Sequence, residues 1–344
     1  MSLENIKDRN LALTQAYQLF AQLFASAPPI ALYKDVLSLT ELKAPQLPPI
    51  LTENPDEAAA AHYYIFNLET LPYESLFSEE SLSTGGPRTL LLQNEYQKYG
   101  FDVRRYKMAA DHLSTQLRFL SHLSGLTAHA AEQSAPFEQH QLEETTQHFL
   151  QNHFLLWVPA YCQSLNPRNA ERQYQQAFVF FQELTLFILQ IAQEHGDSLT
   201  DGSMSVPSHA KTKPCILDTP ECGINDIARY FATPSLCGVF LRRSDIQEIG
   251  RALDLPSGFG PRIDMLTMLF TCAAEYNSFE PLLRGLEDQI KEAQHFHTKE
   301  STSEVWANDC AETIERIEAL SSQARELAQP PRSKAQTNTS SINA

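Results

Sequence analysis

Apolar residues recur every three or four positions along most of this chain. Between residues 4 and 26, for example, one stripe contains Leu13, Tyr17, Phe20 and Phe24, and this spacing predicts an amphipathic helix. Pro28 and Pro29 end the pattern because proline cannot continue a helix. No segment shows the sustained two-residue alternation of a half-buried strand. The chain is therefore predicted to be all-α, a helical bundle.

Four more helices are expected in the first half of the chain. One begins after the cap Asn54, and another ends at Gly100, whose lack of a Cβ suits a helix end. Asp111 is positioned to cap a third helix, and Pro159 is expected to bend or break a fourth. The ranges, in order, are 55–66, 88–99, 113–123 and 142–161, and a very apolar helix follows over 169–195.

A polar segment containing Gly, Ser and Pro divides the chain. We predict a helical domain over 1–195, a linker over 196–214, a smaller helical extension over 215–328 and a disordered tail over 329–344. The extension begins with several turns, and Ser244 to Gln247 resembles a capping box. Its expected helices cover 263–276, 281–296 and 303–327.

The chain is strongly acidic. It has 42 Asp and Glu residues against 26 Lys and Arg, which gives a formal net charge of −16. Such a field repels nucleic acid and anionic membranes and speeds association with cationic partners. Charge of this size also serves solubility alone. Both interpretations stay open, and no nucleic-acid partner is expected.

The sequence favours a cytoplasmic protein. Its first residues, Met1 to Asn5, include an acid where a secretory signal carries basic residues. The most apolar segment, 178–192, is interrupted by polar side chains and predicts a buried helix, so stable membrane insertion is not expected. Six cysteines without an export signal indicate free thiols.

Two sets of side chains in the sequence contain metal-ligating residue types. Cys215, Cys222 and Cys237 lack the close spacing that presents two sulfurs to one ion, which favours structural thiols over a zinc or iron–sulfur site. His140, Glu144 and His148 share one helix face, but Gln and Thr residues around them favour a solvated surface. The three cysteines remain the weak metal candidates.

Nothing in the sequence indicates catalysis. Asp111 and His112 are adjacent, and without a third partner a catalytic dyad is disfavoured. Phosphate-binding glycine loops and nucleophile elbows are absent. We therefore expect a non-enzymatic protein that needs no cofactor.

A series of motifs in the first domain has an order known from one family. Tyr63 to Phe66 form an aromatic helix end, and Pro72-Tyr73-Glu74-Ser75-Leu76-Phe77 follows. Tyr96, Gly100 and Phe101 come next, then Asp111-His112, and finally a helix containing His153, Trp157 and Pro159. Together these motifs, over about residues 10–195, resemble the TorD/DmsD/NarJ family of cytoplasmic chaperones.

The resemblance implies both a function and a site. Members assist molybdopterin-containing oxidoreductases, many exported by the twin-arginine route, and their all-helical first domain binds the client's N-terminal signal. It implies that Asp111 pairs with a client arginine, oriented by His112, and that apolar side chains form a groove wall. The implied client-binding residues are Ile65, Phe66, Tyr73, Ser75, Leu76, Phe77, Gly100, Asp111 and His112.

The implied partners are the catalytic subunit of the client oxidoreductase and its signal peptide. A homodimer formed by helix exchange is an open expectation, with the linker over 196–214 as its candidate hinge. The extension over 215–328 resembles that of longer relatives, and its role is open between docking the client, covering the first domain and binding metal. The alternative function is a metal- or cofactor-carrying accessory protein that uses Cys215, Cys222 and Cys237.

Overall fold

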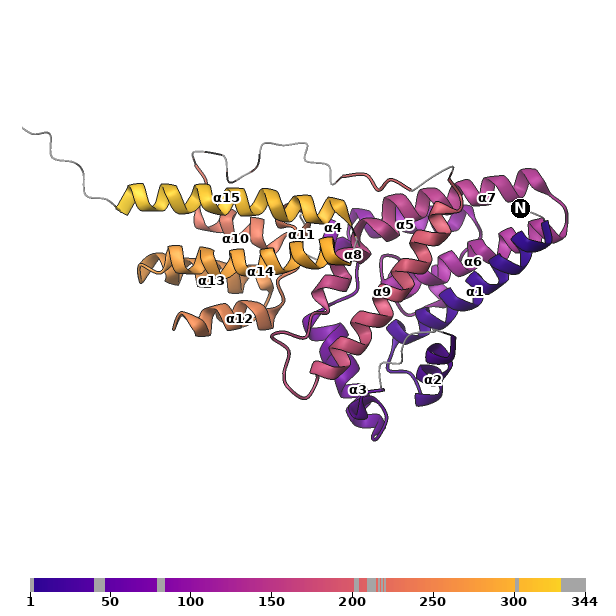
Figure 1. Cartoon of the computed structure of the whole chain (residues 1–344), viewed down its shortest axis with the longest axis horizontal. Helices are drawn as coiled ribbons and strands as arrows, with labels where there is room; N and C mark the ends of the chain where they lie inside the picture. Colours follow the sequence, from indigo (N-terminus) through magenta and orange to yellow (C-terminus); the bar gives the residue numbers. More distant parts are fainter. Residues whose placement is uncertain are drawn as a thin grey trace, which may run out of the picture.

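The computed structural model describes residues 3–39, 47–78, 84–200, 204–208, 215, 217, 219, 221–300 and 303–328. Within these ranges every regular element is a helix, and the one β-bridge joins Tyr73 to His112. The all-α fold predicted from the sequence is confirmed (Figure 1).

The α-helices of the first half are α1 (Leu3–Ala25), α2 (Ile30–Leu39), α3 (Pro55–Tyr63), α4 (Ser75–Ser78), α5 (Pro87–Lys98), α6 (Leu113–Glu132), α7 (Pro136–Phe149), α8 (Leu155–Ser164) and α9 (Gln175–Asp197). Two 3₁₀ helices, η1 (Pro49–Leu51) and η3 (Val103–Arg105), and two π-helices, η2 (Tyr64–Glu69) and η4 (Leu150–Phe154), lie between them. The second half contains α10 (Ile224–Ala232), α11 (Pro234–Cys237), α12 (Arg243–Ala252), α13 (Arg262–Glu275), α14 (Phe279–Lys299) and α15 (Glu304–Ala328).

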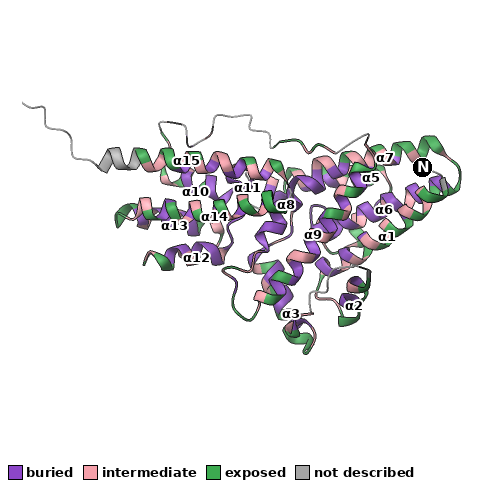
Figure 2. Cartoon of the chain, viewed as in Figure 1, coloured by how far each residue is buried: buried purple, intermediate pink, exposed green. Residues whose placement is uncertain are grey.

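The first half forms a helical bundle around one large apolar core. Helices α1 and α6 pack along their lengths, α7 packs on α6, and α8 packs on α9 (Figure 1). Buried residues gather on the inner faces of α6 and α9, and every residue of α8 is buried (Figure 2). The predicted stripe of α1 is part of this core, since Tyr17, Phe20 and Phe24 are at most 2% exposed.

Some helices begin at the residues that the sequence predicts, and others do not. Asn54 caps α3 as predicted, accepting a hydrogen bond of 2.9 Å from the backbone N–H of Asp56. The prediction that Asp111 caps the next helix is wrong: His112 caps α6, because its Nδ1 accepts from the N–H of Ser114. Helix α9 begins at Gln175, whereas 169 was predicted.

Pro159 does not break its helix. It lies inside α8, and the irregular geometry comes earlier, in the π-helix Leu150–Phe154. A proline removes one N–H donor from the helix interior and crowds the preceding turn. The chain nevertheless continues as a helix through Pro159. The change of hydrogen-bond register lies one to two turns before it.

The second half has its own apolar core, built from α10 to α15, with α14 and α15 side by side (Figure 1). The N-cap of helix α12 is Arg242, two residues before the predicted capping box. The N–H of Arg242 donates to Asp245 Oδ2 over 2.9 Å, and the Arg242 guanidinium pairs with the same carboxylate. Asp245 thus supplies the cap that the sequence placed at Ser244.

Two aromatic side chains from the second half enter the core of the first. Phe240 stacks on Phe77 with ring centroids 4.8 Å apart. Trp306, at the start of α15, is fully buried, and its Nε1–H donates to the backbone oxygen of Leu156 over 2.9 Å. The Ser244 hydroxyl also donates to the buried Glu69 carboxylate over 2.7 Å. The two cores are therefore joined by packing and by buried hydrogen bonds.

The proposed boundaries between domains stay predictions. Helix α9 continues to Asp197, inside the predicted linker, and Met204 beyond it donates its N–H to Asp197. Residues 201–203 and 209–214 of that linker, and the predicted disordered tail over 329–344, lie outside the described residues. Among the residues that are described, no helix is both long enough and apolar enough to cross a membrane.

Replacing Trp306 with alanine tests the joint between the cores. We expect Trp306→Ala to lower the free energy of unfolding by about 3–5 kcal/mol, since a large aromatic side chain is lost and the Leu156 carbonyl loses its donor. Urea unfolding measures the change. Tyr276→Ala, at a side chain 67% exposed, is the control, expected to stay within about 0.5 kcal/mol. Equal effects of the two changes would contradict the role given to Trp306.

Candidate functional site

The structure brings the two strongest sequence motifs together. The segment Pro72–Glu74 pairs with Asp111–Leu113: the N–H of Glu74 donates to the Asp111 oxygen, and the N–H of Leu113 donates to the Pro72 oxygen, each over 2.9 Å. These two bonds form the bridge between Tyr73 and His112, whose rings meet edge to face. We call residues 72–77 with 111–113 the motif junction.

Asp111 is completely buried at this junction. The Ser75 hydroxyl donates to its Oδ2 over 2.6 Å, and among the described residues no group bonds to Oδ1. Tyr96 holds the turn before it by donating to the Ala110 oxygen. Ser75, rather than His112, is the residue that orients Asp111. Burial lowers the pKa of His112 to about 3, and it remains a neutral helix cap at pH 7.

The other predicted binding residues lie mainly inside the core. Ile65, Phe66 and Phe77 are at most 3% exposed, and Leu76 is 7% exposed. Tyr73 is half-buried. Gly100, with φ +70°, ends α5 in an exposed turn and lines a separate recess of about 380 Å³ beside Arg118. Their client-binding role stays a prediction, because the structure contains no client.

A buried polar chain continues from the junction. The Glu74 carboxylate, fully buried, lies 3.1 Å from His153 Nδ1 and 3.3 Å from Arg88 Nε. It also accepts from the Gln116 amide, which in turn accepts from the Trp157 indole N–H over 3.0 Å. On its other side, His153 Nε2 lies 3.2 Å from Glu95. Helices α5, α6 and η4 all meet this carboxylate.

The charges within the buried polar chain balance one another. Burial disfavours the charged form of His153, but hydrogen bonds and charges from Glu74 and Glu95 outweigh it and raise its pKa to about 9. Glu95 is itself half-buried, which opposes its ionisation, yet contacts with His153 and His148 lower its pKa. Two carboxylates, a histidinium and the Arg88 guanidinium therefore neutralise one another inside the bundle.

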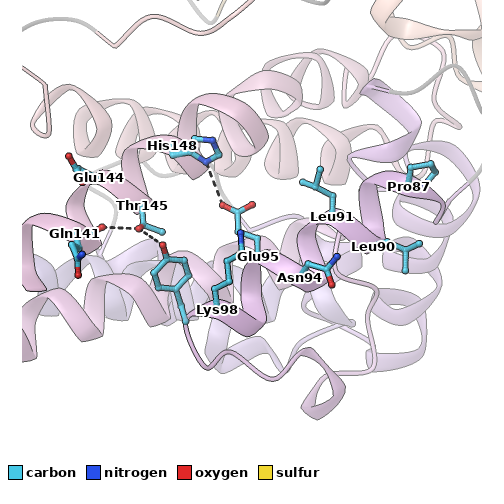
Figure 3. Close-up of a pocket in the computed structure, with 11 residues that line it drawn as sticks. Pro87, Leu90, Leu91, Asn94, Glu95, Lys98, Gln141, Glu144, Thr145 and His148 are labelled. Atoms are coloured by element: carbon cyan, nitrogen blue, oxygen red, sulfur yellow. Dashed lines mark hydrogen bonds and ion pairs between the residues drawn. The ribbon is translucent and has the colours of Figure 1, made fainter.

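The outer end of the buried polar chain, at Glu95, borders a large groove. The groove has a volume of about 950 Å³ and lies between α5 and α7 (Figure 3). From α5 come Leu90 and Leu91, which are 61% and 50% exposed, and also Glu95. From α7 comes His148, 3.5 Å from the Glu95 carboxylate. The Thr145 hydroxyl donates to the Tyr99 hydroxyl and fixes the wall at the other end.

The groove combines apolar and acidic side chains. The exposed Glu144 lies on α7, and Figure 3 shows it at the other end of the groove from Leu90 and Leu91 of α5. Phe137, 75% exposed, lies on the same helical face as Glu144 and His148, because residues seven and eleven positions apart share one face. Such a surface fits a segment that is apolar along part of its length and basic at another part.

The sequence singled out Glu144 and His148, but as a solvated face, and it did not indicate the groove or the buried polar chain. A signal for the groove was the run of three leucines, 90–92, since a helix cannot turn all three toward one core. Glu74 and His153 were both within recognised motifs and are charged residues amid apolar ones. Such residues are buried only when paired, but the pairing across 79 positions had no local signal.

The candidate metal ligands do not converge. Cys237 is buried, its thiol donates to the Val239 oxygen, and burial raises its pKa to about 12. Cys215 and Cys222 are half-buried, and all six cysteines are free thiols, as predicted. Where the chain is described, no three His, Cys, Asp or Glu side chains are grouped to hold a metal ion. His140 forms an exposed ion pair with Glu144, as a solvated face would.

Substitutions in the motif junction are expected to act on stability. Phe77→Ala should lower the free energy of unfolding by about 3–5 kcal/mol because it leaves a core cavity. Asp111→Ala should cost about 1–3 kcal/mol because the Ser75 hydroxyl loses its buried acceptor. Thermal and urea unfolding measure both. The control is Phe137→Ala at an exposed ring, and a loss as small as that of the control would show that the junction opens easily.

The raised pKa of His153 predicts how stability depends on pH. The folded protein binds this proton up to about pH 9, whereas the unfolded chain releases it near pH 6.5. The stabilisation is therefore complete below pH 6.5 and is lost as the pH rises toward 9. Between pH 6.5 and 8.5 we expect the free energy of unfolding to fall by up to about 1.4 kcal/mol per pH unit.

The matched variants are His153→Gln and His140→Gln. Urea unfolding between pH 6.5 and 8.5 should show the slope abolished in the first and kept in the second, whose histidine is 70% exposed. Parallel slopes in all three proteins would contradict a buried histidinium. Below pH 6.5 all three should lose stability, because burial lowers the pKa of His62 to about 4 and that of His195 to about 3.

In the comparison with known proteins, one family model matches part of this chain. Residues 39–163 match the family model described as nitrate reductase delta subunit, a family of molybdoenzyme assembly chaperones. No curated protein and no solved structure gives a significant match. The matched residues contain the motif junction, the buried polar chain and both walls of the α5–α7 groove. The match thus supports, for this part of the chain, the chaperone family that the motifs indicated.

Proposed function

We propose that this protein is an assembly chaperone for a molybdopterin-containing oxidoreductase. It holds the signal peptide or another segment of the apo-enzyme until the cofactor has been inserted, and it acts in the cytoplasm without catalysing a reaction. The observation that carries this proposal is the match of residues 39–163 to the nitrate reductase delta subunit family, since these residues build both walls of the α5–α7 groove.

The α5–α7 groove is the proposed binding surface. Leu90 and Leu91 expose apolar area that the described residues leave uncovered, and such area drives association when another surface covers it. Glu95 and Glu144 place carboxylates beside that area. A twin-arginine signal has a basic part followed by an apolar part, and it would meet both kinds of side chain.

The groove has room for a peptide rather than for a single side chain. Its volume of about 950 Å³ is near the upper end for ligand pockets. From Pro87 to Lys98 the wall of α5 extends about 16 Å, at 1.5 Å per residue. An apolar segment of about two to three helical turns matches this length.

The binding role of Ile65, Phe66, Tyr73, Ser75, Leu76, Phe77, Gly100, Asp111 and His112 remains a separate prediction. Most of these side chains are buried, so a client reaches them only if the junction opens locally. The groove, by contrast, offers exposed side chains in the described conformation. The catalytic subunit of an oxidoreductase and its signal peptide are the proposed partners, and a homodimer stays a prediction.

Affinity capture with groove variants tests this proposal. The tagged full chain is incubated with lysate of the native host at low salt, and the bound proteins are identified by mass spectrometry. We expect the catalytic subunit of a molybdopterin oxidoreductase, with a Kd at least about tenfold weaker for Leu90→Ser/Leu91→Ser, since burial of each leucine contributes about 1.5–3 kcal/mol.

Leu11→Ser is the matched control, because Leu11 is a leucine 42% exposed on α1, outside the groove. Its client binding should equal that of the unchanged chain, and all variants should unfold at the same temperature. Glu144→Lys should slow association and weaken its dependence on salt. Capture that survives the double serine change would place the client elsewhere, and capture of no molybdoenzyme would reject the proposed function.

A further inference from the structure

A second cavity, of about 300 Å³, lies where the two cores meet. Its apolar walls are Leu71, Leu76, Phe240 and Ile263, from four separate segments of the chain. It shares no lining residue with the α5–α7 groove. Leu76 is the one residue of the motif junction among its lining residues, and the others come from outside both the junction and the groove.

Two arginines line the cavity without carboxylate partners. The Arg262 guanidinium lies 3.8 Å above the Phe240 ring, and one of its N–H groups donates to the Leu241 oxygen over 3.2 Å. Arg243 faces the same space. For the described part of the chain, neither guanidinium is within ion-pairing distance of an acid. Most of their N–H donors are thus available to a ligand.

The fold does not favour these two charges. Burial lowers the pKa of Arg262 to about 10, and the neighbouring positive charge of Arg243 acts in the same direction. Arg243 is also the first residue of α12, where the helix dipole disfavours a cation. Cations held close together in partly buried positions cost free energy unless an anion joins them.

The local charge sets the kind of anion. Arg242 is already paired with Asp245, and the Glu69 carboxylate, which accepts from Ser244, also lines the cavity. Arg243 and Arg262 against Glu69 leave one net positive charge. A doubly charged phosphate would be repelled by Glu69, whereas a carboxylate balances the site and matches the planar fork of a guanidinium.

We propose that this cavity binds a carboxylate attached to an apolar group. The carboxylate lies between Arg243 and Arg262, and the apolar group contacts Phe240, Leu76 and Ile263. The ligand is either a free organic acid or the C-terminal residue of a partner chain, which share this chemistry. A cavity of about 300 Å³ accommodates one side chain of this kind, since it is at the lower limit for ligand pockets.

Calorimetric titration of the full chain with N-acetylphenylalanine tests the proposal. The uncharged amide of the same compound should bind at least tenfold more weakly. Arg243→Gln should weaken binding of the acid at least tenfold without lowering the unfolding temperature, because Arg243 forms no ion pair with the residues that the structure describes. The matched control is Arg251→Gln, at an exposed arginine of the same helix, and it should bind the acid as the unchanged chain does.

Arg262→Gln provides a second variant on the other side of the carboxylate, with the same expected loss of binding. Peptides that end in phenylalanine distinguish the sources: tighter binding than N-acetylphenylalanine, abolished by amidation, identifies a partner's C-terminus, and equal binding identifies a free acid. Equal binding of acid and amide, undiminished binding by Arg243→Gln, or tighter binding of inorganic phosphate would each overturn the proposal.

Discussion

The Glu74 carboxylate is buried where water cannot solvate it, and the packing around it follows from the need to neutralise its charge. Transferring an unpaired carboxylate into such surroundings costs several kcal/mol. Arg88, Gln116 and His153 supply the compensating contacts from α5, α6 and η4. These helices are therefore fixed relative to α4, and the surface of α5 is set in place for the groove.

This arrangement separates what stabilises the bundle from what is available for recognition. The conspicuous motif residues, such as Phe77 and Asp111, lie in the interior, and the side chains open to a partner come from less conspicuous positions on α5 and α7. Glu95 belongs to both sets, since it pairs with buried His153 and borders the groove. A change of charge in the groove can thus reach the interior through two contacts.

Local patterns were enough to predict the helical class, the stripe of α1 and the cap at Asn54, because these depend on neighbours within a few residues. They failed where distant residues decide the outcome. Asp111 looked like a helix cap, yet Ser75 engages its carboxylate. The pairing of His153 with Glu74, the entry of Trp306 into the first core and the meeting of Arg243 with Arg262 all depend on tertiary packing that no short pattern contains.

Gly238 gives the joint between the halves an unusual sensitivity. It has φ +80°, and a Cβ there would lie 2.5 Å from the backbone nitrogen of Cys310 on α15. Trp306 is one turn earlier on the same helix, inside the other core. A side chain at position 238 would therefore displace α15 at Cys310. Because Trp306 lies about one helical turn from this contact, its indole would be pulled out of the first core. The absence of a side chain at Gly238 thus allows the Trp306 indole to pack in the first core.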